Sequence, residues 1–462
     1  MSTPLIDQDA AARVAAAAAT GCRAEVFAES WVLSRAVAEQ DGLRLAQRRR
    51  EGMGLSLVTA QGVHHRHLPW LATDRLPLLL ADHPAAGRGG AGPIPGGQDG
   101  PDVSAEADLA TAETLSRMVG VAAAEAGAAY PGVTTARVTG EFTRRVTLVA
   151  REDGVLREDV NGRVELRVTV TARRNGGTAR VLRVAGAEVA DPGALAAAVG
   201  DERIRAAARA AAVVAVRDLD AVDPPVGELS VVLAAGGPGA LLHEVCGHGL
   251  EADVALQPGA AYGGALGQRL APSGLTLIDS PRAPAGAGLY RFDDEGEPAA
   301  EVALLEDGVL RSYLHDRRTA GATGAEPHGH GRRLSYAYPA LPRMSCTYVA
   351  PGTLSPEEIV AATPFGLYVE SIVSGETDMS SGRFSVRVTS GRLIENGRLT
   401  APIREATLTG TGLGVLSAID LIGDDLRFMP YGYQCNKLGQ FPLTVSVGQP
   451  TLRVAAMAVS GP

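Results

Sequence analysis

The sequence predicts an α+β protein: an N-terminal domain of helices and an antiparallel sheet, then a β-rich C-terminal domain that carries the helix of a metal site. Three observations predict this class. Residues 134–184 alternate apolar and polar side chains between turn signals, as an antiparallel meander does. The segments on either side have apolar residues three and four positions apart, which is typical of helices. The second half is mostly short strands and turns, with one helical segment near its start.

The composition sets broad limits on the class of protein. Of 462 residues, 45% are apolar and 21% charged, which suits a globular chain of two or three domains. A net charge of −9 argues against nucleic-acid binding, which needs a basic face. No apolar run approaches the roughly 20 residues that span a bilayer, so no membrane segment is expected. The four cysteines are too few for a disulfide scaffold, and we expect a cytoplasmic protein.

The N-terminal domain is predicted over residues 1–222. Its first elements are a proline-free helix over 11–47 and a strand over 54–59. A loop or disordered insertion rich in Gly and Pro follows at 82–102, because such a composition cannot bury enough apolar surface to offset its ordering entropy. A helical pattern returns over 105–129.

The meander and a long helix complete this domain. Turn signals divide the meander at 153–154, 161–162 and 175–177, and a helix over 191–219 opens with Asp-Pro. Prolines at 224 and 225 end that helix and mark the domain boundary. The C-terminal domain is predicted over 226–462, with a helical segment over 239–255, strands at 229–235, 275–279 and 386–389, and turns at 307–308 and 395–397.

The helical segment over 239–255 holds a candidate metal motif. His243 and His248 flank Glu244, and imidazoles bind Zn²⁺ while a glutamate can accept a proton from water at the metal. The two histidines are five residues apart, however, which leaves them about 140° apart around a regular α-helix. They can share a metal only if the helix is distorted. Gly247 and Gly249 offer a place for a π-bulge or a helix end.

A catalytic zinc usually takes three protein ligands, so a third must come from elsewhere. Spacing alone does not choose among the candidates. They are Cys435, Cys346, His315, His328, His330 and the carboxylates.

Beyond this motif, the chain resembles the TldD/PmbA proteins, specifically the metal-bearing TldD-like branch. The resemblance rests on motifs in the right order across residues 229–455. They include HEVCGHGLEAD (His243–Asp253), DDEG (293–296), a segment at 304–316, GRRLSY (Gly331–Tyr336), PRMSCTY (Pro342–Tyr348), SGRF (381–384), LIENG (393–397) and a closing stretch from Cys435 to Leu452.

The resemblance implies a zinc-dependent protease with one Zn²⁺ per chain, held by His243, His248 and Cys435. Glu244 takes the place of the general base. The resemblance also implies a dimer that encloses a channel, in which extended peptides bind by strand addition. We expect a homodimer, with a heterodimer containing a metal-free paralogue as the alternative.

Three functions follow as hypotheses. The first is a zinc-dependent hydrolase that cleaves amide C–N bonds of extended peptides inside the dimer channel. The second is an amide hydrolase dedicated to one small natural-product intermediate, and the third is a non-catalytic subunit that only shapes a channel. The candidates for binding substrate or stabilising the oxyanion are Arg332, Arg333, Tyr336, His315 and His330.

Overall fold

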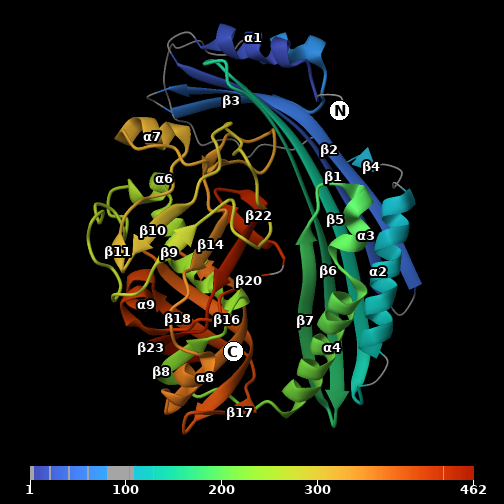
Figure 1. Cartoon of the computed structure of the whole chain (residues 1–462), viewed down its shortest axis with the longest axis vertical. Helices are drawn as coiled ribbons and strands as arrows, with labels where there is room; N and C mark the ends of the chain where they lie inside the picture. The colour runs from blue at the N-terminus through green and yellow to red at the C-terminus, as the bar shows by residue number, and fades with distance from the viewer. Residues whose placement is uncertain are drawn as a thin grey trace.

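The computed structural model describes residues 5–19, 22–39, 42–59, 62–80, 103–104, 109–127, 130–429 and 431–461. The chain forms two halves that face each other (Figure 1): a long curved sheet from the first half and several β-sheets from the second. The predicted α+β class is confirmed. The segment predicted as a loop at 82–102 lies outside the described residues. The domain boundary between 222 and 226 stays a prediction.

Seven described strands build the N-terminal sheet. Its order is β3-β2-β1-β5-β6-β7, all antiparallel, with the short β4 also pairing to β2. The consecutive neighbours β5, β6 and β7 confirm the predicted meander. The strands are β1 (Arg23–Glu39), β2 (Gly42–Thr59), β3 (Gly62–Leu68), β4 (Val103–Ser104), β5 (Val133–Arg151), β6 (Leu156–Arg174) and β7 (Gly177–Glu188).

Helices cover the face of this sheet that points away from the C-terminal half (Figure 1). Helices α2 (Leu109–Gly127) and α4 (Asp201–Arg217) bury Leu115, Met118 and Ile204 in one apolar core with β5, β6 and β7. Helix α1 (Gln8–Ala18) and the 3₁₀ turn η1 (Thr73–Leu79) close a second core at the other end of the sheet. The sheet therefore presents its remaining surface to the second half of the chain.

The predicted helix over 11–47 is wrong after Ala18, because residues 23–39 and 42–59 are paired strands. In β1, Val26 and Ala28 pack toward α1, while Phe27 packs against Tyr336 of the C-terminal half. Both faces of this strand are buried, so its apolar residues are consecutive rather than alternating. Such runs produce the three- and four-residue spacings that a helix also has.

Two smaller predictions in this half are also wrong. The turn expected at 161–162 lies inside β6, where Gly162 pairs with Arg144 of β5. A Cβ at Gly162 would lie 2.2 Å from the Val189 carbonyl oxygen, so glycine serves close packing there and not a turn. The helix expected over 191–219 is interrupted, because α3 (Leu195–Ala198) ends before Gly200 and α4 begins at Asp201.

The described residues of the C-terminal half form two larger sheets and one two-stranded sheet. The first larger sheet has the order β11-β10-β9-β14-β22-β20, with β21 on β22, and the second has the order β15-β8-β23-β18-β16-β17, with β19 on β23. The strands are β8 (Gly227–Leu233), β9 (Leu277–Asp279), β10 (Val302–Glu306), β11 (Val309–Leu310), β12 (Gly331–Arg332), β13 (Leu341–Pro342), β14 (Cys346–Val349), β15 (Phe365–Thr377), β16 (Arg383–Glu395), β17 (Arg398–Pro402), β18 (Ala406–Thr411), β19 (Ile419–Ile422), β20 (Arg427–Phe428), β21 (Tyr433–Lys437), β22 (Gln440–Gln449) and β23 (Leu452–Ser460).

Short helices connect these strands. They are α5 (Ala240–Leu242), α6 (Ala252–Ala255), α7 (Arg317–Thr323), α8 (Pro356–Ala361) and α9 (Gly412–Ala418). The strands predicted around 229–235, 275–279 and 386–389 are found as β8, β9 and part of β16. The two predicted turns are confirmed, since Asp307 and Asn396 adopt left-handed conformations with φ of 49° and 53°. Among the described residues, no helix is both long and apolar enough to cross a bilayer.

Ion pairs fasten the two halves together. The Arg145 guanidinium donates to Glu29 within the sheet at 2.8 Å and to Asp294 of the C-terminal half at 3.0 Å. Arg333, which is fully buried, contacts Glu25 of β1. Buried pairs of this kind fix the docking geometry, because separating them would leave uncompensated charges.

Candidate metal centre

The metal motif lies on a distorted helix that follows β8. The chain turns at Gly236, whose φ is +92°, and then passes through α5 into a π-helical turn, η5 (His243–Gly247). The His248 amide donates to the His243 carbonyl, an i+5 bond that places His248 beneath His243. The two ring centroids are 5.1 Å apart. The distortion predicted from the five-residue spacing is therefore confirmed.

The glycines of the motif are needed for packing as well as for the turn. A Cβ at Gly247 would lie 2.0 Å from the Met344 sulfur, and a Cβ at Gly249 would lie 2.4 Å from the Tyr262 ring. The helix therefore approaches its neighbours more closely than any other residue would allow.

Cys435 of β21 completes a buried group with the two histidines. One ligand atom from each of His243, His248 and Cys435 lies within 4.8 Å of the others, and the Cys435 sulfur is 3.3 Å from His248 Nε2. Their exposed fractions are only 0%, 3% and 1%. Of the third-ligand candidates that the sequence left open, the structure brings Cys435 to the histidines. Two imidazoles and a thiol are a donor set that suits zinc.

His243 supports this interpretation independently. Neither nitrogen of its buried ring has a hydrogen-bond partner among the described residues. Burying polar nitrogen atoms without partners is costly, so the ring is expected to have a partner such as a metal ion.

The charges at the centre favour a thiolate. Burial raises the pKa of the Cys435 thiol, but the positive charges of His248 and Arg343 outweigh it and hold that pKa well below its ordinary value. Burial lowers the pKa of His248, and the negative charges of Cys435 and Glu251 raise it well above its ordinary value. Arg343 is itself fully buried, and its guanidinium has no hydrogen-bond partner among the described residues.

Glu251 and Lys437 form a buried charged pair next to His248. His248 Nδ1 lies 2.9 Å from Glu251 Oε2, which leaves Nε2 facing Cys435. The Lys437 ammonium lies 3.0 Å from the same Glu251 oxygen, contacts Asp253, and donates to the Pro342 carbonyl at 2.8 Å. Burial raises the pKa of Glu251, but Lys437 and His248 outweigh it and lower that pKa to about 2. A carboxylate behind a ligand histidine fixes the ring orientation and the tautomer.

Glu244 follows His243 directly and is more exposed than the three candidate ligands. Its side chain is half-buried, and Tyr433 donates a hydrogen bond of 2.7 Å to its Oε1. The Tyr433 ring also packs edge-on against His243, with centroids 5.2 Å apart. Tyr433 can therefore hold the carboxylate beside the three candidate ligands.

Sequence reasoning missed Glu251, Tyr433 and Lys437 as site residues. Two signals were available in principle. Tyr433 and Lys437 are each two positions from Cys435, so an extended strand places all three on one face. Lys437 is also the only lysine in the sequence, and the other 42 basic residues are arginines.

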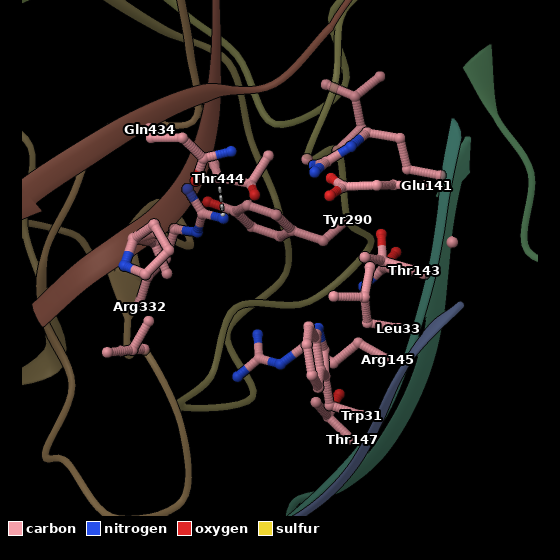
Figure 2. Close-up of a pocket in the computed structure, with 18 of the residues that line it drawn as sticks. Trp31, Leu33, Glu141, Thr143, Arg145, Thr147, Tyr290, Arg332, Gln434 and Thr444 are labelled. Atoms are coloured by element: carbon pink, nitrogen blue, oxygen red, sulfur yellow. Dashed lines mark hydrogen bonds between the residues drawn. The ribbon is translucent and has the colours of Figure 1, made fainter. Parts of the chain in front are cut away.

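The five predicted substrate-binding residues fall in different places. Arg332 lies in the wall of a cavity between the two halves, with Tyr290, Gln434 and Thr444 beside it (Figure 2). The other four are buried in internal contacts: Arg333 with Glu25, His330 with Asp279, His315 with Thr319, and Tyr336 against Gly52. A role for any of the five in binding substrate stays a prediction.

Residues 226–461 match the family model described as the PmbA/TldA metallopeptidase C-terminal domain. A metalloprotease TldD homolog from Haemophilus influenzae is 33% identical over 68% of this chain and 65% of its own length. A second, from Buchnera aphidicola of Schizaphis graminum, is 34% identical over 57% of this chain and 54% of its own. A metalloprotease from Synechocystis is 31% identical over 71% of this chain and 69% of its own length.

This chain therefore spans less than two thirds of the length of the first two relatives. A zinc metalloprotease TldD homolog from Saccharolobus solfataricus is 34% identical over 53% of this chain and 54% of its own. Solved structures share the fold over nearly the whole chain. TldE from Thermococcus kodakarensis superposes with a TM-score of 0.74 at 14% identity, covering 97% of this chain and 99% of that one.

Proposed function

The chain belongs to the PmbA/TldD metallopeptidase family, and on this premise we propose that it is a zinc-dependent peptidase that hydrolyses amide C–N bonds. The single observation that carries the proposal is the π-helical turn. It brings His243 and His248 together with Cys435 and leaves Glu244 accessible beside them. A subunit that only shaped a channel would not need a carboxylate next to three buried donor atoms.

The residues have distinct roles in this proposal. His243, His248 and Cys435 would hold the zinc, which when bound supplies Lewis acidity toward a carbonyl group and a water molecule. Glu251 orients the His248 ring, and Tyr433 orients the Glu244 carboxylate. Glu244 accepts a proton as the oxygen of the water bonds to the carbonyl carbon. It then delivers that proton to the nitrogen as the C–N bond breaks.

Zinc content and hydrolysis, measured on the same variants, test the proposal. We expect about one zinc per chain in the wild type and in Glu244→Gln, and loss of zinc in His248→Ala and Cys435→Ala. Cys346→Ala, which removes another buried thiol, is the matched control and should keep its zinc. Glu244→Gln should lose about 10²–10⁴-fold in the rate of cleaving an unfolded peptide mixture, followed by mass spectrometry.

Two results would contradict the proposal. Full zinc retention in Cys435→Ala would move the third ligand elsewhere. A wild-type chain that binds no zinc when zinc is supplied would remove the basis for hydrolysis. The enclosed channel of a dimer stays a prediction from the family resemblance, and the homodimer and the cytoplasmic location stay predictions from the sequence. The choice between extended peptides and a small natural-product amide is also open to test.

A further inference from the structure

A cavity of about 510 Å³ lies between the two halves, apart from the metal centre. Figure 2 shows Trp31, Thr143 and Arg145 from the sheet on one side, and Arg332 and Thr444 from the C-terminal half across from them. A pocket of this size can hold a small molecule or a short stretch of extended peptide.

The hairpin of β21 and β22 separates this cavity from the metal centre. Gln434 and Thr444 are paired across the hairpin, and both line the cavity. Cys435 is the next residue along β21, so its side chain leaves the strand on the opposite face, toward His248. A ligand in the cavity therefore lies behind the wall that carries Cys435.

The cavity wall is rich in arginine, in contrast to the net charge of −9 for the whole chain. The acids that line it are Glu141, Glu188, Asp293 and Asp294. Glu141 pairs with Arg35 at 2.6 Å and Asp294 with Arg145 at 3.0 Å. Outside the lining, Glu29 accepts from both Arg50 and Arg145, and Glu165 pairs with both Arg163 and Arg167. The arginines that line the cavity are Arg35, Arg48, Arg50, Arg145, Arg163, Arg167 and Arg332.

One of the acids that line the cavity, Glu188, is only about half ionised at pH 7. Although Glu188 is exposed to solvent, desolvation by the surrounding protein raises the pKa of its carboxyl to about 7, against the opposing effects of the Arg163 charge and the Gly288 amide. The wall thus carries more positive than negative charge, and an anion would be attracted into it.

Several of these cations are held in place by rings. The Arg50 guanidinium lies 5.0 Å from the Trp31 ring centroid, and that of Arg332 lies 4.9 Å from the Tyr290 ring. Arg332 also donates to the carbonyls of Met344 and Thr444 at 2.7 and 2.9 Å. Guanidinium groups fixed in this way lose little freedom when they bind carboxylates, which they match in shape.

We propose that this cavity is a second binding site, for a ligand that carries several carboxylates. The ligand is either an acidic stretch of a peptide or a small polycarboxylic acid. The site extends beyond the proposed peptidase activity, because its lining contains none of His243, His248 and Cys435. Binding there should persist when zinc is lost.

Fluorescence anisotropy with a labelled hexaglutamate peptide tests the proposal. The full-length, zinc-loaded Glu244→Gln variant should bind this peptide and not a labelled hexalysine of the same length. Adding Arg48→Gln or Arg167→Gln should weaken binding about five-fold each. The matched control is Arg49→Gln, whose side chain leaves β2 on the other face and pairs with Glu51 at 2.8 Å. It should leave the affinity unchanged.

Competition and a zinc-free variant complete the test. Displacement by citrate would identify a small polycarboxylate as sufficient, whereas displacement only by unlabelled hexaglutamate would identify a peptide. His248→Ala, which is expected to lose zinc, should still bind hexaglutamate, so a failure of the peptidase proposal can be told from a failure of this one. Absence of binding, preference for hexalysine, or equal weakening by Arg49→Gln would overturn the proposal.

Discussion

Lys437 shows how one residue can support a candidate metal centre to which it contributes no ligand. Its ammonium is 1% exposed and contacts Glu251, Asp253 and a backbone carbonyl. In a chain that otherwise uses only arginine, a lysine at this position is informative. An ammonium is a compact point charge, whereas a planar guanidinium needs more room and different partners.

Replacing Lys437 by Met should weaken zinc binding about 10–100-fold, because Glu251 would then be a buried charge without its cation and would orient His248 poorly. Competition with a chromophoric chelator measures the affinity. The effect should largely disappear when Lys437→Met is made in a Glu251→Gln background. Equal losses in the two backgrounds would show that Lys437 does not act through Glu251.

The candidate site could be predicted only in part from the sequence. His243, Glu244 and His248 were found because they are adjacent in the chain, and their spacing even required the distorted helix that is observed. Cys435 was one of several open candidates until the family resemblance singled it out. Tyr433 and Lys437 reach their partners across more than 180 residues. Local periodicity carries no information about contacts of that range.

At the level of elements, the π-helical turn depends on close packing at Gly247. Gly247→Ala should lower the free energy of unfolding by about 1–3 kcal/mol, because the added methyl group collides with the Met344 sulfur. Chemical denaturation measures the change. The matched control is Gly120→Ala in α2, where a Cβ meets nothing within 4 Å and the substitution should stabilise by about 0.5–1 kcal/mol. An unaffected Gly247→Ala would show that Met344 moves aside at no cost.

The elements that were predicted well are those with one buried face. The meander of β5, β6 and β7 has helices on one side and alternates cleanly, so its period was visible. Strand β1 was mistaken for a helix because its N-terminal part is buried on both faces, by α1 on one side and by the C-terminal half on the other. The surfaces that bury a strand depend on how the two halves dock. The local sequence pattern carries no information about that docking.

For the whole molecule, Glu188 connects stability to pH at the junction of the halves. It accepts a hydrogen bond from the Gly288 amide at 2.9 Å and lies near Arg163 and Glu165. Its pKa of about 7 exceeds the value of about 4.3 in an unfolded chain, so the folded state binds more protons between these values. The contribution of Glu188 to stability is therefore full below about pH 4 and is lost as pH rises toward 7.

Denaturation at pH 5 and pH 8 checks this contribution. The wild type should lose more stability between the two values than Glu188→Gln, in which the side chain cannot ionise. Glu228→Gln, at an exposed position in β8, is the control and should follow the wild type. Identical pH dependence in the wild type and Glu188→Gln would contradict the prediction.

The solitary lysine also has a practical consequence for studying the motions of the molecule. Apart from the terminal α-amino group, Lys437 carries the only primary amine in the chain, and it is buried. A reagent that acylates amines can modify this side chain only when the protein around it opens locally. The rate of acylation at this one position would therefore measure how often the residues that pack around Lys437, Glu251 among them, separate.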